Sequence, residues 1–139
     1  MVNNNMSVTH KEFLTSAEAM GRGTGEIDLR NAASRAYYSA YHACQNVVNF
    51  CPNVNVSDAG QHEKLILRFK RYPSTDPRYP LANKIANLLD QAKSLRVRAD
   101  YKISLPFRRN ATETQVYNVK RLLGLAQDFG NAHAAPPSP

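Results

Sequence analysis

An arginine and a histidine seven positions apart, Arg35 and His42, are the two side chains of this sequence best suited to chemistry. At about 100° per residue, seven steps come to roughly 700°, nearly two full turns of an α-helix. The two side chains therefore share one helical face. A guanidinium that is always charged can stabilise a phosphate, and an imidazole exchanges a proton near neutral pH. Together they suit the cleavage of a phosphodiester without a metal ion.

The helix that carries this pair has an apolar stripe on its other side. Small, aromatic and aliphatic residues recur there at helical spacing and predict the core: Ala33, Ala36, Tyr37, Ala40, Cys44, Val47 and Val48. The opposite face carries polar residues and one tyrosine: Arg35, Tyr38, Ser39, His42, Gln45 and Asn46. We therefore expect His42 to face solvent, another helix or a partner subunit, with Tyr38 and Ser39 as possible supporting residues.

Apolar periodicity and helix-stop signals predict five helices, at about residues 9–20, 26–50, 61–69, 81–101 and 112–130. Ser57 or Asp58 is the expected cap of the third helix, and Thr112 with Gln115 forms a capping-box pattern for the fifth. The glycine-rich residues 21–25 predict a loop, and they lack the Gly-Lys-Ser/Thr ending of a phosphate-binding loop. No strand pattern competes, so we expect an all-α fold.

Length and composition predict one domain in the 139 residues, with a flexible start (1–8), a helical domain (9–130) and a disordered tail (131–139). No window approaches the ~20 apolar residues of a membrane span, and the polar start lacks the apolar segment of a secretory signal. We therefore expect no membrane partner and a cytoplasmic location. Cys44 and Cys51 are expected to be free, packed thiols. With no zinc-site spacing and no clustered carboxylates, neither a metal nor another cofactor is expected.

Basic residues outnumber acidic ones, 18 Lys and Arg against 11 Asp and Glu, which gives a formal charge of +7 and a pI of about 9.6. This surplus favours a polyanionic partner, and RNA is the leading candidate. Tyrosines and a phenylalanine are interspersed with the basic residues, as on surfaces that meet phosphates and stack bases. The candidate RNA-binding residues are Arg68, Lys70, Arg71, Arg96, Arg98, Arg108 and Arg109. The alternative is that each cluster is simply a solvated helix face.

Three segments, in their order and spacing, resemble the small stand-alone bacterial and archaeal members of the HEPN superfamily. They are Ser-Arg-Ala-Tyr-Tyr continuing to Tyr-His-Ala (34–43), Gly-Gln-His (60–62) and Leu-Arg-Val-Arg-Ala-Asp-Tyr (95–101). The resemblance covers about residues 9–130. It implies an antiparallel, up-down bundle of four main helices plus a shorter helix, paired as a homodimer. Many such proteins are metal-independent ribonucleases that act as toxins in toxin–antitoxin or phage-defence systems, often beside a nucleotidyltransferase-like antitoxin.

The resemblance also implies roles for the Arg35 and His42 pair, since the family signature is an arginine, four to six intervening residues and a histidine. His42 would deprotonate the ribose 2′-hydroxyl or protonate the departing 5′-oxygen, and Arg35 would stabilise the transition state. Two copies of the pair would meet across the dimer, and the products would carry a 2′,3′-cyclic phosphate. The chain departs from many active members in having Ala36 after the arginine and in carrying the motif on an early helix.

These departures leave a non-catalytic alternative open, namely a HEPN module that binds RNA, a nucleotide or a protein partner, or a helical adaptor. In that interpretation Arg35 pairs with Asp100, Tyr38 and Tyr101 pack at a helix crossing, and His42 makes a dimer contact. His62 could be a second proton-transfer group or an RNA contact, or simply a surface residue near a helix start.

Overall fold

The computed structural model describes residues 7–134 of the chain. This part contains five α-helices and one short 3₁₀ helix, and no strand. The elements are α1 (His10–Gly21), α2 (Glu26–Gln45), η1 (Val48–Phe50), α3 (Gln61–Lys70), α4 (Tyr79–Tyr101) and α5 (Arg109–Ala132). The prediction of an all-α fold is confirmed. None of these helices is long and apolar enough to cross a membrane.

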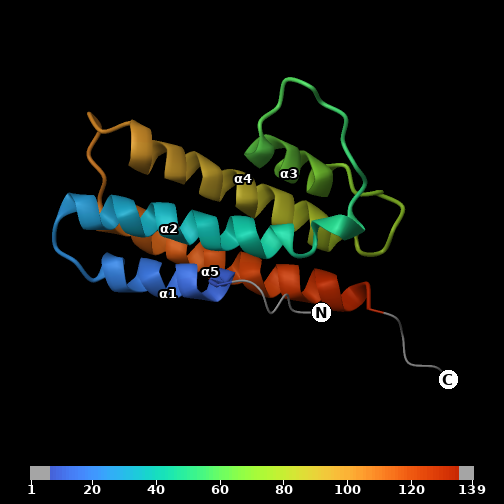
Figure 1. Ribbon diagram of the computed structural model, residues 1–139, viewed down its shortest axis with the longest axis horizontal. Coiled ribbons are helices and arrows are strands. Elements are labelled where there is room, and N and C mark those ends of the chain that lie inside the picture. The colour runs from blue at the N-terminus through green and yellow to red at the C-terminus, as the bar shows by residue number, and fades with distance from the viewer. Residues whose placement is uncertain (1–6, 135–139) are drawn as a thin grey trace.

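The long helices lie side by side, and α2 is the central one. It packs against α1, α4 and α5, while the shorter α3 packs mainly against α4 (Figure 1). The segment between η1 and α3 extends outward from the rest of the molecule before the chain returns into α3 (Figure 1). Because α2 contacts three other helices, its apolar stripe and most of its other side are covered.

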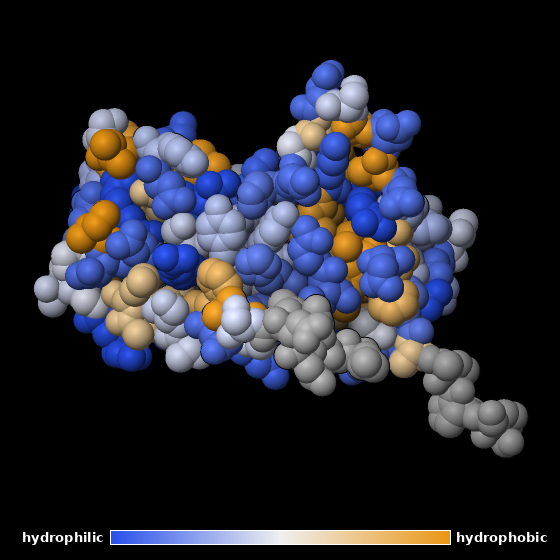
Figure 2. Space-filling model, viewed as in Figure 1, coloured by the Kyte–Doolittle hydropathy of each residue, from blue (hydrophilic) through white to orange (hydrophobic). Residues whose placement is uncertain are grey.

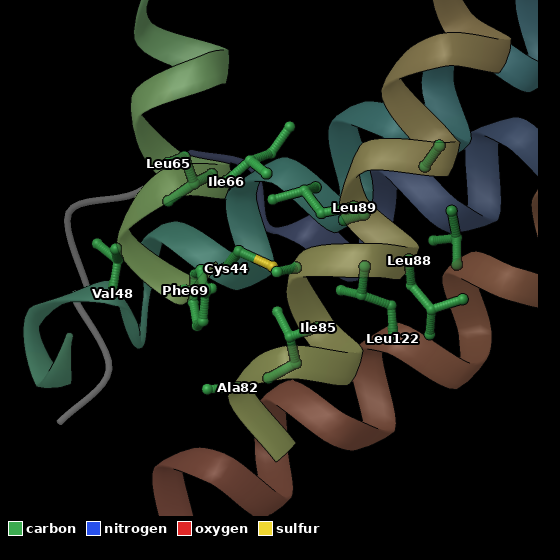
Figure 3. Close-up of a cluster of buried hydrophobic side chains, with 14 of the residues drawn as sticks. Cys44, Val48, Leu65, Ile66, Phe69, Ala82, Ile85, Leu88, Leu89 and Leu122 are labelled. Atoms are coloured by element: carbon green, nitrogen blue, oxygen red, sulfur yellow. The ribbon is translucent and has the colours of Figure 1, made fainter. Parts of the chain in front are cut away.

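The main core is formed where α2, α3, α4 and α5 meet. Phe69 of α3, Ile85 and Leu89 of α4 and Leu122 of α5 converge with Cys44 of α2 (Figure 3). These five side chains are fully buried. Burying an aliphatic or phenyl side chain of this size contributes about 1.5–3 kcal/mol, so this cluster supplies much of the driving force for the bundle.

A second, smaller core closes the end of the molecule where α4 ends. Its apolar members are Leu29, Ala33, Ala99 and Phe107. Beside them the buried Arg30 of α2 forms hydrogen bonds with backbone oxygens at and beyond the end of α4.

The Arg30 guanidinium donates to the carbonyls of Arg98 (3.2 Å), Ala99 (2.9 Å) and Lys102 (3.5 Å), and also to that of Leu105. The last carbonyls of a helix have no partner within the helix, so this one side chain caps α4 and fixes the loop that follows it. Periodicity did not indicate this role, because it depends on a carbonyl cluster about 70 residues away in sequence.

The predicted second helix is too long at its C-terminal end. α2 ends at Gln45, and a turn and the 3₁₀ helix η1 carry the chain to Cys51. Both Cys44 and Cys51 are free and buried, which confirms the prediction of free, packed thiols. Burial raises the pKa of both thiols, that of Cys51 to about 12. They are therefore protonated and unreactive in the folded chain.

The predicted start of the fifth helix is wrong, because α5 begins at Arg109 and places Thr112 and Gln115 in its buried interior face. The Thr112 hydroxyl donates to the Leu29 carbonyl (2.9 Å). The Gln115 amide donates to the carbonyls of Ala33 (3.3 Å) and Ala92 (2.9 Å). Instead of capping their own helix, the two side chains join α5 to α2 and α4.

The predicted cap of α3 is also wrong, since Gly60 occupies the N-cap position and no side chain caps this helix. α5 continues through Gly130 to Ala132, two residues beyond the predicted stop. The expected flexible start (1–8) and disordered tail (131–139) lie largely outside the described residues; of the described part, Asn131 and Ala132 belong to α5.

Candidate catalytic and RNA-binding site

Arg35 and His42 lie along the edge of α2 that faces α1, on either side of the same aromatic residue of α1. The His42 ring is 5.0 Å from the ring of Phe13, measured between centroids. The exposed Arg35 lines a surface pocket of about 200 Å³ together with Phe13, Ser16 and Met20. Both side chains thus lie on the face of α2 beside Phe13, Arg35 exposed and His42 partly buried.

His42 is partly buried among aromatic rings. Its ring contacts those of Tyr41 (5.4 Å) and Tyr38 (6.5 Å) as well as that of Phe13. Burial in these surroundings lowers the pKa of His42 below its usual value of about 6.5. The imidazole is therefore neutral at pH 7, which is the state that a general base requires.

Ser39 does not share the accessible edge, and the prediction that it faces away from the core is wrong. It is fully buried, and its hydroxyl donates to the carbonyl of His10 at 2.6 Å. The reason is that α1 covers this part of α2. Ser39 therefore holds the first turn of α1 in place and is not accessible to a substrate.

The pairing of Arg35 with Asp100, which the non-catalytic alternative implies, is not formed. Asp100 accepts a hydrogen bond from the Ser34 hydroxyl (3.1 Å) and lies 3.8 Å from Nη1 of Arg96. Consecutive residues of a helix point about 100° apart. Ser34 therefore faces α4 while Arg35 faces α1, and α4 carries Asp100 on the side that Arg35 does not reach.

The three sequence segments that carry the HEPN resemblance meet in a second cluster, where α2, α3 and α4 come together. The Tyr37 hydroxyl lies 2.5 Å from Nδ1 of His62, the second residue of α3. The guanidinium carbon of Arg96 lies 5.3 Å from the ring of Tyr37 and 5.8 Å from the rings of both Tyr38 and Tyr101. Tyr38 and Tyr101 therefore both lie against the guanidinium of Arg96.

Tyr41 and Tyr38 lie between the two clusters. The Tyr41 ring is 4.6 Å from the ring of His62 and 5.4 Å from that of His42. Tyr38 likewise lies 6.0 Å from His62 and 6.5 Å from His42. Two histidines from different parts of the chain are thus joined by a short row of aromatic rings.

Several predicted RNA-binding residues form contacts within the chain itself. Arg68 donates to the carbonyls of Cys51 (2.9 Å) and Pro52 (3.1 Å), and so fixes the segment that follows η1. Lys70 lies 3.8 Å from a carboxylate oxygen of Asp90.

Arg109 and Arg96 also contact other parts of the chain itself. Arg109 donates to the carbonyls of Gly21 and Gly23, at 2.7 Å each, and holds the loop between α1 and α2. Arg96 is only 8% exposed, because three tyrosine rings lie against it, so it does not stand on an open surface. Of the predicted set, Arg71, Arg98 and Arg108 remain exposed without a carbonyl or carboxylate contact among the described residues.

Arg98 and Arg108 come together at one groove. They line it with Leu95, Pro106 and Asn110, and the groove has a volume of about 430 Å³. Arg98 also lies over the ring of Phe107, with 5.4 Å between its guanidinium carbon and the ring centroid. The two arginines are ten positions apart and are brought together by the turn between α4 and α5. This groove offers two phosphate-binding side chains within reach of one strand.

Among residues 7–134, no three His, Cys, Asp or Glu side chains gather in a way that could hold a metal ion. A scan against models of known protein families found no match, and a search of curated proteins found none either.

Proposed function

We propose that this chain is a HEPN-like, metal-independent endoribonuclease that acts through Arg35 and His42. One observation carries the proposal: Arg35 and His42 lie on one face of α2 beside Phe13, and burial lowers the pKa of the imidazole so that it is neutral near pH 7. The all-α architecture and the basic charge support the proposal. We infer that the fold is the up-down HEPN bundle, with α1, α2, α4 and α5 as its main helices.

In this mechanism, Nε2 or Nδ1 of neutral His42 removes the proton from a ribose 2′-hydroxyl. The 2′-oxygen attacks the adjacent phosphorus, and the bond to the 5′-oxygen breaks as that oxygen takes a proton from an acid. Arg35 stabilises the negative charge that builds up on the phosphoryl oxygens. The products are a 2′,3′-cyclic phosphate and a free 5′-hydroxyl.

A homodimer would supply the acid that the mechanism needs. On this edge one copy offers His42 and, at the start of α1, a partly buried His10, whose pKa burial lowers as well. Base and acid act on opposite sides of the phosphorus at the same time. Two copies that pack with these edges together would bring His42 of the partner subunit opposite the first. The negative charge of the bound phosphate favours a proton on one of the two imidazoles, which can then act as the acid. Light scattering on the purified chain tests this, and a strict monomer at high concentration would count against a composite site.

We infer a biological role as a cytoplasmic toxin of a toxin–antitoxin or phage-defence system, neutralised by a nucleotidyltransferase-like antitoxin. The sequence resemblance supports this role. Induced expression should arrest growth, and His42→Ala should relieve the arrest while the protein remains folded. Equal toxicity of both proteins would contradict the role of His42.

RNA binding without cleavage is the second candidate function, and the groove of Arg98 and Arg108 favours it. The groove lies on the turn between α4 and α5, whereas Arg35 and His42 lie beside α1. A chain that binds RNA there and leaves it intact would show salt-sensitive affinity with no products. The same labelled RNA serves both tests.

The deciding experiment is cleavage of a labelled single-stranded RNA by the purified chain in EDTA. We compare the native chain with His42→Ala, Arg35→Ala and, as a matched control, Lys84→Ala, which removes an exposed charge from α4. The native chain and the control should cleave and leave a cyclic phosphate, while the first two variants should lose at least about a hundredfold in rate. Intact RNA with the native chain would favour the binding module, and unchanged cleavage by His42→Ala would exclude the proposed base.

A further inference from the structure

A nearly buried guanidinium, that of Arg96, lies between α2 and the C-terminal half of α4. It is 8% exposed and is surrounded by the rings of Tyr37, Tyr38 and Tyr101, 5.3–5.8 Å from its central carbon. The faces of aromatic rings attract a cation. They do not, however, replace the oxygen acceptors that the five N–H groups of an arginine require.

Within residues 7–134, the guanidinium of Arg96 has no oxygen acceptor at hydrogen-bond distance. Its Nε is buried without a partner, and the oxygen of Asp100 is 3.8 Å from Nη1, which is too long for a hydrogen bond. A buried N–H group without an acceptor is costly, so the Nε of Arg96 calls for a partner such as a ligand oxygen or a water. The fork of N–H groups matches the oxygens of a phosphate.

His62 adds a second donor beside Arg96, against the same tyrosines. Its ring lies 5.5 Å from that of Tyr37 and 6.0 Å from that of Tyr38. Burial, together with the positive charges of Arg96 and Lys93, lowers the pKa of His62, so the ring is neutral. Burial raises the pKa of Tyr37, so its hydroxyl keeps its proton beside Nδ1 of His62. In the tautomer in which Nδ1 accepts from this hydroxyl, the imidazole proton is on Nε2 and can be donated to an oxygen of a ligand.

The start of α3 contributes a third feature that favours an anion. No side chain caps this ten-residue helix, so its first N–H groups have no side-chain acceptor and present the positive end of the helix dipole. The space-filling view shows a hollow between the segment that carries α3 and the C-terminal end of α4 (Figure 2). Glu63 and Asp100 are the carboxylates at this place, and each already has a partner, Lys93 (3.1 Å) and Ser34 (3.1 Å).

We propose that Arg96, His62 and the start of α3 form a binding site for a phosphate group. The ligand is a phosphate ester, either free or part of an RNA strand. Two rings flank the site, that of the partly exposed Tyr38 and that of the exposed Tyr101. Either ring could stack with a base next to the bound phosphate. The site lies across Tyr38 and Tyr41 from His42, and it does not depend on cleavage at Arg35 and His42.

Binding is tested by titrating the full chain with inorganic phosphate at constant ionic strength and following the ring signals of its histidines by NMR. His62→Gln assigns the His62 signal. We expect a saturable shift of His62 and a rise in its pKa, because a bound anion favours the charged imidazole. The ring signal of His133, which follows the C-terminal end of α5, should not shift as phosphate is added. No saturable change at His62, or an equal change at His133, would overturn the proposal.

Variants then identify the donor. Arg96→Met fills similar volume and should weaken phosphate binding at least about tenfold, while Lys84→Met, an equal loss of charge on the same helix, should leave it unchanged. If Arg96→Met fails to fold, Lys93→Met replaces it, since this variant leaves Glu63 unpaired beside the site and should also weaken binding. Native affinity in a folded Arg96→Met variant would overturn the proposal.

A second titration, with a short single-stranded RNA, separates the two sources of the phosphate. If RNA shifts the His62 signal and inorganic phosphate competes with it, the site holds a phosphate of the strand. If inorganic phosphate binds and RNA leaves the His62 signal unchanged, the ligand is a free phosphate ester. Phosphate binding is measured by the NMR signal of His62, and cleavage is measured by the effect of His42→Ala. A negative result in one test therefore leaves the other test valid.

Discussion

The Tyr37 hydroxyl and Nδ1 of His62 lie 2.5 Å apart, and this contact joins the buried face of α2 to the first turn of α3. Tyr37 is fully buried, so its hydroxyl cannot be satisfied by bulk water. A histidine at the start of a short helix thereby becomes part of the packing of the whole bundle.

Replacing Tyr37 with phenylalanine should destabilise the chain by about 1 kcal/mol, because it removes one buried hydrogen bond and keeps the ring. Urea unfolding measures the change. The matched control is Tyr117→Phe, since Tyr117 is exposed and its hydroxyl makes no hydrogen bond within residues 7–134. A Tyr37→Phe variant as stable as the native chain would show that the contact contributes nothing.

Stability should fall as the pH is lowered from 7 to 5. The pKa values of His10, His42 and His62 are lowered in the fold, chiefly by burial, whereas the unfolded chain has values near 6.5. Below about pH 6.5 the unfolded state therefore binds more protons than the folded state, and stability decreases as pH decreases.

Urea unfolding at several pH values between 5 and 7 measures this dependence. His62→Gln removes one of the three histidines and should make the decrease shallower over the same range. A decrease as steep in the variant as in the native chain would mean that His62 has the same pKa in both states.

Arg30→Met should destabilise the chain by about 3 kcal/mol. The substitution leaves the carbonyls at the end of α4 without their donor, and hydrogen bonds from a charged group are among the stronger ones. Lys102→Met is the control, because the Lys102 side chain is exposed in the same loop. Thermal unfolding gives the loss of stability, and hydrogen exchange should rise most in residues 102–108. Equal stability of the two variants would contradict the capping role.

The two thiols should be protected from a thiol reagent in the folded chain and should react once urea unfolds it. Burial keeps Cys44 and Cys51 out of solvent and raises their pKa values, so little thiolate forms at pH 8. Absorbance after addition of a disulfide reagent counts the accessible thiols. Fast reaction of either cysteine in the native chain would be inconsistent with its burial.

Removing both arginines of the groove, in Arg98→Ala with Arg108→Ala, should weaken RNA binding and reduce its salt dependence. Each lost phosphate contact lowers the slope of log K against log salt by about 0.7 for a single strand, so the double variant should lose about 1.4. Fluorescence anisotropy over a range of salt concentrations measures the slope. Lys84→Ala is the control. An unchanged slope in the double variant would show that RNA does not bind at this groove.

Helical periodicity in the sequence was enough to predict several features of this protein. It predicted the helical class, the core face of α2 and the position of Arg35 and His42 on a shared edge, because these depend on steps of about 100° within one helix. It was less accurate at helix ends. Where α2 ends and α5 begins depends on contacts with other helices, which local signals do not contain.

Only the tertiary structure decided what each polar side chain does. Ser39 and Arg96 look accessible on a helical wheel, yet α1 covers the first and three tyrosines cover the second. Arg30 caps a helix that begins about fifty residues later, and His62 meets Tyr37 across 25 positions. A hydrogen bond needs two groups within about 3 Å, and when its partners are far apart in sequence, only the packing of the helices brings them together.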